Sequence, residues 1–267
     1  MSRAPDIRIH DELPDATGPH KVGTADEGNT MRHPRTAVRG LVGLTALALV
    51  SGCVPGVGGD DGRDGPEQQP VGRGQLTEAQ VESALPKEDQ APEGFAIDDE
   101  VDEDSAPDTE GSAYPASCLD VRLAGNARED LATHQKTKLK RSFTGDNGGV
   151  LSVTVTSYDT QVPDRLFDDA GASQSGCGTF QLIDKTGTTS WKLDQVAFPQ
   201  LGDRTYSTRA ESTTDGDIFK GGVVQIAGVS VGNNLIYTVY AAGPQSAYDP
   251  AAAESLTKAT VDNLNAL

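Results

Sequence analysis

Residues 223–241 read VVQIAGVSVGNNLIYTVYA. Two runs rich in β-branched residues flank the sequence GNN at 232–234, which is the clearest turn signal in the chain. The pattern predicts two antiparallel strands joined as a hairpin. The apolar positions change parity between Ile226 and Val229, so we expect a β-bulge near Gly228 to restore one buried face.

Strand and turn patterns continue on the N-terminal side of this hairpin. Residues 151–156 alternate apolar and hydroxyl side chains and follow the turn sequence DNGG, which predicts a hairpin with 136–143. Further strands are expected over 180–183 and 191–196, which are predicted to pair as a second hairpin, and over 205–210. Helices are expected over 76–85, from Ser117, over 163–170, and from Asp249-Pro250 to the C-terminus. Strands in runs, bracketed by helices, predict an α+β fold: a central antiparallel β-sheet flanked by N-terminal and C-terminal helices.

Charge excludes several functions. The 267 residues contain 22 Lys+Arg and 40 Asp+Glu, which gives a formal net charge of −18. This acidic balance argues against nucleic-acid binding and against charge-driven docking on anionic lipid headgroups, because both need clustered basic side chains. Residues 87–114 include a crowded acidic stretch with no apolar period, and we expect a solvated loop there.

Residues 31–53 carry the pattern of an export signal. Arg32, Arg35 and Arg39 precede a ten-residue apolar run that ends in Val50-Ser51-Gly52-Cys53. The run is too short to span a bilayer but is typical of a signal-peptide core. The ending resembles a bacterial lipobox, which implies that Cys53 receives diacylglycerol and becomes the new N-terminus. The alternative is a short buried helix followed by a core cysteine.

The remaining boundaries follow from this signal. The signal peptide is expected at 31–52, with translation starting at Met31, so that 1–30 is either outside the protein or a disordered extension. Residues 53–75 are rich in Gly, Asp, Pro and Gln and are expected to form a disordered tether. The folded domain is expected at 76–267, beginning at Leu76.

Two cysteines remain after Cys53, namely Cys118 and Cys177. An even pair in an exported protein predicts a disulfide that closes a loop of about 60 residues. The alternative is two buried free thiols. The lack of CxxC spacing and of histidine clusters argues against a zinc site.

Candidate catalytic residues are few. His134 is the only histidine beyond Cys53, and residues 228–232 match G-x-S-x-G with Ser230 in the nucleophile position. A nucleophile elbow needs a helix after the turn, but a strand is expected there, so we interpret Ser230 as a strand residue. His134 is interpreted as a surface residue beside the basic cluster Lys136, Lys138, Lys140 and Arg141. The carboxylate pairs Asp168-Asp169 and Asp215-Gly216-Asp217 lack the spacing of a calcium loop.

The chain from Leu76 onward resembles the PknH-like extracellular sensor domain of actinobacteria. The matching segments are a short helix at 76–85, YPASC at 114–118, a strand that ends at Tyr158, GCG at 176–178, VGNNLIY at 231–237 and a terminal helix. Members of the family often carry four cysteines in this domain, whereas this chain carries two. The resemblance implies a central antiparallel sheet flanked by helices, with a surface cleft, and a role in sensing or binding.

The expected function is therefore a lipid-anchored sensor or ligand-binding lipoprotein on the extracytoplasmic face of the cell membrane. We expect no enzymatic activity, no cofactor, no metal and no nucleic acid. The expected partners are the membrane, through diacylglycerol on Cys53, and either a cell-wall or lipid ligand or a basic protein. Two alternatives stay open: a structural or protein-docking lipoprotein that uses its acidic surface, and an envelope hydrolase that uses Ser230 or a carboxylate pair. The candidate cleft-lining residues are Val224, Ile226, Leu235, Tyr237 and Val239.

Overall fold

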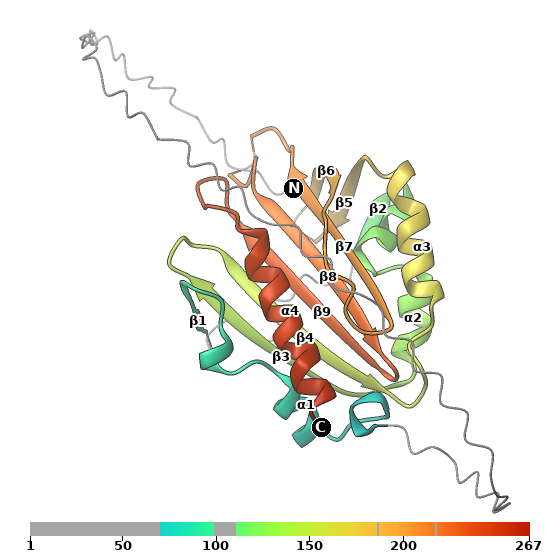
Figure 1. The fold of residues 1–267 in the computed structure, drawn as a ribbon. Helices are drawn as coiled ribbons and strands as arrows, with labels where there is room; N and C mark the ends of the chain where they lie inside the picture. The colour runs from blue at the N-terminus through green and yellow to red at the C-terminus, as the bar shows by residue number, and fades with distance from the viewer. Residues whose placement is uncertain (1–69, 99–110, 186, 217) are drawn as a thin grey trace, which may run out of the picture. The chain divides into compact units, whose positions relative to one another are not determined.

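In the computed structural model, which describes residues 70–98, 111–185, 187–216 and 218–267, nine strands form one antiparallel sheet (Figure 1). The order across the sheet is β1-β3-β4-β9-β8-β7-β6-β5-β2. These residues fall within one compact unit of the chain, Gly62–Leu267. The predicted α+β fold with a central antiparallel sheet is confirmed. The strands are β1 (Phe95–Ile97), β2 (Ser112–Tyr114), β3 (Gln135–Gly145), β4 (Val150–Tyr158), β5 (Thr179–Asp184), β6 (Gly187–Gln195), β7 (Arg204–Ser212), β8 (Val223–Val231) and β9 (Asn234–Ala242).

The β8–β9 hairpin lies at the centre of the sheet, as its sequence predicts, but the expected bulge near Gly228 is wrong. The register with β7 and with β9 is continuous through Gly228, which pairs with Tyr206 and Tyr237. Apolar residues of both parities are accommodated without a bulge, because β8 is covered on both faces of the sheet. A Cβ atom at Gly228 would lie 2.2 Å from Leu123 Cδ1, so glycine here serves the close approach of the covering segment.

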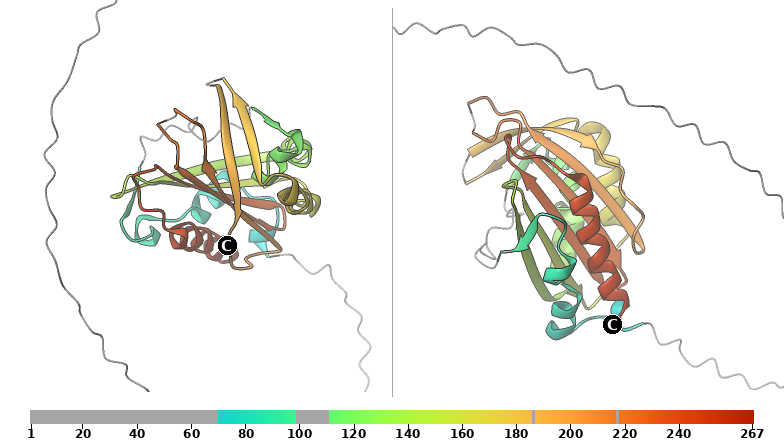
Figure 2. Two further views of the ribbon diagram at one scale, coloured as in Figure 1. Left: turned by 90° about the horizontal axis from the view of Figure 1, so that it is seen from above. Right: turned by 60° about the vertical axis from the view of Figure 1, so that its left-hand side comes forward.

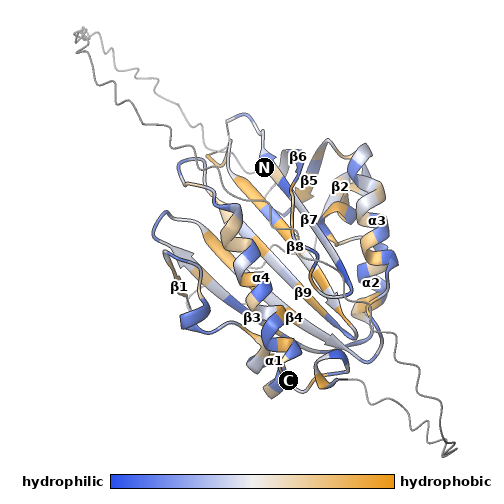
Figure 3. Ribbon diagram, in the orientation of Figure 1, coloured by the Kyte–Doolittle hydropathy of each residue, from blue (hydrophilic) through white to orange (hydrophobic). Residues whose placement is uncertain are grey.

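One face of the sheet is covered by α4 (Pro250–Asn265) together with α1 (Glu78–Ala84). Figure 3 shows hydrophobic residues concentrated along β4 and β8, the strands that flank β9 beneath α4. Val153, Val229 and Tyr240 pack there against Leu256 and Leu264 of α4, and all five are fully buried. The predicted caps are present: Thr77 and Gln80 form a capping box for α1, and Asp249 caps α4 with Pro250 in the first turn.

The other face is covered over part of its area by helical segments from the middle of the chain. These are the 3-10 helix η4 (Ala116–Arg122), α2 (Asn126–Ala132) and α3 (Arg165–Ser173), followed by η5 (Gln174–Gly176). Their buried cluster includes Leu123, Leu131 and Phe167 and packs on Tyr206 and Leu235 of the sheet. The helix expected from Ser117 is thus a 3-10 helix followed by a separate α-helix. Strands β5 and β6 turn steeply away from β3 and β4 (Figure 2).

Two sequence boundaries need correction. Structure begins before Leu76, because the 3-10 helix η1 (Val71–Arg73) and the residues after it form a strap across the β8–β9 turn. In this strap, defined here as residues 70–76, the Arg73 carbonyl accepts from Asn233 N–H, and Asn234 Nδ2 donates to the carbonyls of Gly72 and Gly74. The turn offers hydrogen-bond groups that a Gly-rich segment can reach with its backbone, so low hydrophobicity did not prevent order.

The segment 87–114 is also more ordered at its ends than the predicted loop. It contains the 3-10 helix η2 (Glu88–Gln90), β1, which pairs with β3, and β2, which pairs with β5. Both are three-residue strands at the two edges of the sheet, and three residues are too short to show an apolar period. The acidic stretch at 99–110 lies outside the described residues.

Candidate functional site

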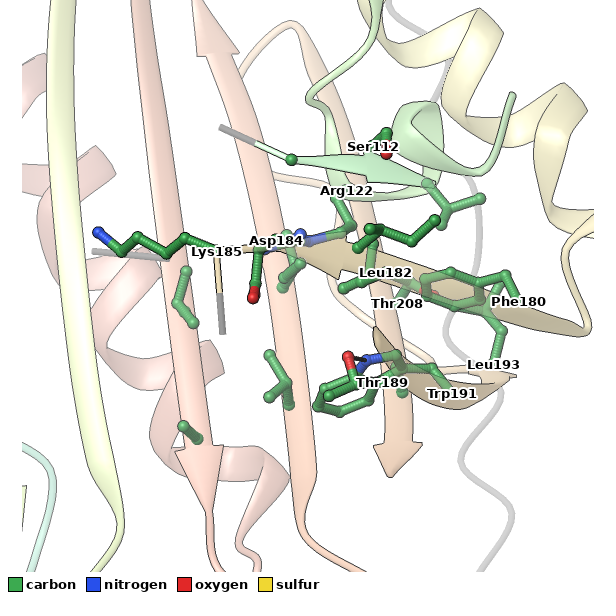
Figure 4. Close-up of a pocket in the computed structure, with 18 residues that line it drawn as sticks. Ser112, Arg122, Phe180, Leu182, Asp184, Lys185, Thr189, Trp191, Leu193 and Thr208 are labelled. Carbon is green, nitrogen blue, oxygen red and sulfur yellow. Dashed lines mark hydrogen bonds between the residues drawn. The ribbon is translucent and has the colours of Figure 1, made fainter. Parts of the chain in front are cut away.

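A cavity of about 630 Å³ lies on the sheet face opposite α4 (Figure 4). Most of its wall is apolar and comes from five neighbouring strands, β5 to β9, with η4 closing one side. Its volume falls in the ordinary range for small-molecule sites. The lining residues are Gly111, Ser112, Val121, Arg122, Phe180, Leu182, Ile183, Asp184, Lys185, Thr189, Trp191, Leu193, Thr208, Ala210, Val224, Ile226, Val239 and Ala241.

The strand register places these side chains side by side. Ile226 pairs with Thr208 on one neighbouring strand and with Val239 on the other, and Val224 pairs likewise with Ala210 and Ala241. Paired residues point to the same face of a sheet, so the rows continue from strand to strand. The same argument joins Trp191 to Phe180, and Leu182 to Thr189, across β5 and β6.

The cavity exists because this part of the sheet face is left without a full covering layer. Tyr206 and Leu235 of the same face are buried under the helical segments, whereas Val224, Leu193 and Trp191 stay only partly buried. Ala210 and Ala241 contribute short side chains to the floor. A contiguous apolar surface in a concave site is typical of a binding region.

Two tyrosines, the buried Tyr206 and the partly buried Tyr237, fasten η4 at the rim of the cavity. The Tyr206 hydroxyl donates to the Val121 carbonyl at 3.0 Å, and the Tyr237 hydroxyl donates to the Arg122 carbonyl at 3.0 Å. Burial raises the pKa of Tyr206 to about 12 and also raises the pKa of Tyr237. Both hydroxyls therefore remain protonated donors at neutral pH and hold η4 at a fixed height above the sheet.

The predicted disulfide between Cys118 and Cys177 is confirmed and acts on the same region. Its Cα atoms lie 5.6 Å apart, and it joins η4 to the residue that follows η5 and precedes β5. Both cysteines are buried in a small cluster with Val121 and Phe180, which also line the cavity. The disulfide thus ties one wall of the cavity to its rim.

The polar groups of the cavity are few. Thr189 Oγ1 accepts a hydrogen bond from Trp191 Nε1 at 2.8 Å, which fixes the indole ring against the wall. Arg122 extends from η4 among the cavity residues, and Asp184 and Lys185 follow at the end of β5 (Figure 4). The arrangement can hold an apolar body while offering charged groups at one side.

The five candidate lining residues divide into two groups. Val224, Ile226 and Val239 line the cavity. Leu235 and Tyr237 do not, because the half of the hairpin nearest its turn lies under Leu123 and Phe167, where both join a packed cluster. They are part of the core.

The sequence interpretation missed the β5–β6 half of the cavity, including Phe180, Leu182, Trp191 and Leu193. A signal for these residues was present. Trp191 and Leu193 share one parity of a predicted strand, in a hairpin with 180–183. What the sequence did not show was that this hairpin is placed beside β7 and so extends the same apolar face.

The structure does not give Ser230 the setting of a nucleophile. It lies inside β8, pairs with Arg204 and Leu235, and is 3% exposed. Strand β9 follows the turn after it, so the strand–turn–helix of a nucleophile elbow is not formed. His134 Nδ1 lies 2.8 Å from Asp159 Oδ1 in a solvent-exposed pair, which agrees with its interpretation as a surface residue.

The remaining sequence candidates are engaged in surface ion pairs or lie outside the described residues. Asp168 pairs with Arg204, Asp169 with Arg165, and Asp215 with Lys220. Within the described ranges no group of three or more His, Cys, Asp or Glu residues could hold a metal ion. Cys53, the signal segment and Asp217 lie outside those ranges.

The chain has an α+β fold, a nine-stranded antiparallel sheet with helices on both faces. It is similar to the crystal structure of the extracellular domain of PknH from Mycobacterium tuberculosis, with a TM-score of 0.52 and 13% identity over 73% of this chain and 100% of that domain. A structure of an uncharacterized Mycobacterium smegmatis protein, the Rv0999 ortholog, aligns with a TM-score of 0.42 and 16% identity over 72% and 98% of the two chains. At 13% identity, the likeness to the PknH domain concerns the fold.

No protein-family model matches the sequence, and no curated protein matches it either. In the described part of the chain, no helix has both the length and the apolar character needed to cross a membrane.

Proposed function

We propose that this chain is a lipid-anchored sensor domain that binds a small apolar molecule on the extracytoplasmic side of the cell membrane. The single observation that carries the proposal is the cavity of about 630 Å³, whose apolar wall is supplied by five adjacent strands. Side chains such as Val224 and Trp191 remain partly exposed there, although burial of apolar surface is favourable. A ligand that covers them would gain that free energy.

The location of the domain is proposed from the sequence and from the disulfide. Cys53 ends a lipobox-like segment, and the strap that begins at residue 70 leaves a short connection between the acylated residue and the domain. The bond between Cys118 and Cys177 is of the kind that persists in oxidising compartments. Both features support a domain held close to the outer face of the membrane.

Substitution of Cys53 tests the anchor. We expect the Cys53→Ser chain to move from the membrane fraction to the soluble extracytoplasmic fraction and to lose the mass of the acyl group. Retention of the variant in the membrane with an unchanged lipid mass would contradict the anchor, although it would leave the cavity proposal intact.

Binding of a neutral apolar dye tests the cavity. N-phenyl-1-naphthylamine is uncharged and gains emission in apolar sites, so we expect the folded Cys53→Ser chain to bind it at one saturable site. Ala241→Leu fills part of the cavity floor and should weaken dye binding about ten-fold or more. Ala96→Leu, the same substitution at an exposed position of β1, is the matched control. Equal binding by the parent, Ala241→Leu and Ala96→Leu would show that the dye does not occupy the cavity.

A further inference from the structure

The cavity contains a cationic side chain, Arg122, although the chain as a whole is strongly acidic. Among the described residues that line it, the charged ones are Arg122, Asp184 and Lys185, and both Asp184 and Lys185 have interaction partners of their own. The whole chain has a formal net charge of −18. An anion is repelled by the average surface of such a protein but is attracted by a cation that has no carboxylate partner.

Arg122 differs from most described arginines in its pairing. Arg73, Arg141, Arg165, Arg204 and Arg209 each form an ion pair with an Asp or Glu side chain. Among the described residues, no carboxylate lies within ion-pair distance of Arg122, although the chain has 40 acidic residues. Arg122 is also half-buried, which makes an unpaired guanidinium costly.

The backbone of Arg122 is held rigidly at the cavity rim. Its carbonyl accepts the Tyr237 hydroxyl at 3.0 Å, and the next residue, Leu123, is buried against Gly228 of β8. Upstream, the disulfide at Cys118 fixes the start of η4. A guanidinium on such a support presents parallel N–H donors that match a carboxylate or a phosphate in a two-pronged pair.

We propose that the ligand of the cavity is an anionic amphiphile, an inference that rests on the ligand-binding function proposed above. Its alkyl or acyl chain packs on the apolar wall formed by Val224, Ile226 and Trp191, and its carboxylate or phosphate pairs with Arg122. The cavity thus binds two parts of one ligand: it buries the alkyl or acyl chain on its apolar wall, and it forms charge-assisted hydrogen bonds with the headgroup.

The test compares three probes that share one alkyl chain length: dodecanol below its solubility limit, and dodecanoate and dodecyl phosphate below their micelle concentrations, all at neutral pH. Trp191 is the only tryptophan of the chain and lines the cavity, so its emission in the full-length Cys53→Ser protein reports occupancy without a label. We expect both anions to bind about ten-fold or more tightly than dodecanol. Replacing dodecanoate by tetradecanoate should tighten binding by about fifteen-fold, since each of the two added methylenes contributes roughly four-fold when buried.

Variants of Arg122 assign the headgroup contact. Arg122→Gln should remove the preference for the anions and leave dodecanol binding within about two-fold, and Arg122→Lys should retain part of the preference. Arg165→Gln, which removes a cation from an exposed ion pair on α3, is the matched control and should keep the full preference. A thermal unfolding transition shows whether each variant is folded. If Arg122→Gln does not fold, the affinities of Arg122→Lys for the three probes are used in its place.

The outcomes separate this inference from the proposed function. Equal affinity for the three probes overturns the anionic ligand, and an anion preference that survives in Arg122→Gln overturns the assignment of the headgroup to Arg122; in both cases binding in the cavity stands. No change in Trp191 emission with any probe, together with a failure of the neutral dye to bind, overturns both. The tighter of the two anions identifies the headgroup as a carboxylate or a phosphate.

Discussion

Asp203 joins the N-terminal strap to the central hairpin. Its Oδ1 lies 2.6 Å from Arg73 Nη2, and its Oδ2 accepts the Gly232 N–H at 2.8 Å. Burial alone would raise the pKa of this carboxyl, but the hydrogen bonds from Arg73 and Gly232 outweigh it, so the pKa lies below the ordinary value of 3.8. The ionised form is therefore bound more favourably in the folded state than in the unfolded state.

We expect Asp203→Asn to lower the free energy of unfolding by about 1–2 kcal/mol at neutral pH. Because the folded pKa of Asp203 is depressed, its stabilisation is present above pH 3.8 and is lost as the pH falls through the folded pKa. Urea unfolding of parent and variant should differ at neutral pH and converge in strong acid. Asp262→Asn, which removes an exposed i,i+4 pair with Lys258, should change little at either pH. A difference for Asp203→Asn that is constant with pH would contradict the assignment.

Gly232 is the residue around which the β8–β9 turn and the strap meet. Its φ is +57°, and a Cβ atom at this position would lie 2.1 Å from the Arg73 carbonyl oxygen, a backbone atom. Gly148 in the β3–β4 turn also has a positive φ, of +76°, but a Cβ atom there would meet no atom closer than 3.5 Å. A comparison of alanine at Gly148 with alanine at Gly232 therefore distinguishes the cost of a positive φ from the cost of steric overlap with the strap.

We expect Gly148→Ala to cost about 1 kcal/mol, the strain of a left-handed alanine, and Gly232→Ala to cost about 2–4 kcal/mol because the strap must also move. Equilibrium unfolding in urea gives both values. Hydrogen exchange of Asn233 N–H, which donates to the Arg73 carbonyl, should accelerate in Gly232→Ala and stay slow in Gly148→Ala. Equal costs for the two variants would show that the strap is not packed on the turn.

At the level of elements, α4 is fastened to the sheet by a pair of buried hydroxyls within an otherwise apolar contact. Thr257 Oγ1 lies 2.8 Å from Thr238 Oγ1 of β9 and donates to the Ala253 carbonyl at 2.7 Å, and both threonines are fully buried. Thr257 uses its only hydroxyl hydrogen on Ala253, so Thr238 donates to Thr257. The two positions are chemically unequal although their side chains are the same.

We expect Thr257→Val to cost about 1–2 kcal/mol, because it leaves the buried Thr238 hydroxyl without an acceptor, whereas Thr238→Val should cost less than 1 kcal/mol. The double variant should be as stable as Thr238→Val or more so, which gives a coupling energy of about 1 kcal/mol in a double-mutant cycle. Thermal unfolding of the four proteins measures it. Additive single effects would contradict the hydroxyl pair.

Helices and hairpins were predictable from the sequence where a few adjacent residues specify their start or their turn. The turn sequence before Val150, the capping box at Thr77 and the Asp249-Pro250 helix start are each decided within a few residues. The edge strands β1 and β2 were not, because three residues carry no period and their pairing partners lie about 50 and 70 residues away in the chain.

At the scale of the whole molecule, the cavity could be predicted only in part, because it is set by register across five strands. Val224, Ile226 and Val239 belong to the hairpin whose faces the sequence revealed, and these three line the cavity. Trp191 enters the same wall only through the pairing of β6 with β7, which no local pattern specifies. Leu235 and Tyr237 share the parity of the lining residues, yet the covering of α2 and α3 makes them core.

The acidic excess also acts on the molecule as a whole. With 40 acidic and 22 basic residues, mutual repulsion between carboxylates favours expanded states, and the ion pairs that offset it, such as Lys136–Asp159, lie at the surface and contribute little. Salt screens both effects, but the repulsion involves more charges over longer distances. The balance therefore predicts that added salt stabilises the fold.

We expect the unfolding midpoint of the Cys53→Ser chain to rise by about 2–4 °C between low salt and roughly 0.5 M sodium chloride, which corresponds to about 1 kcal/mol for a domain of this size. Choline chloride at the same ionic strength should give the same rise, since screening does not depend on the identity of the cation. A rise with sodium alone would indicate specific cation binding in place of screening. A fall in the midpoint would mean that the surface ion pairs outweigh the repulsion, which would contradict the weak contribution assigned to pairs such as Lys136–Asp159.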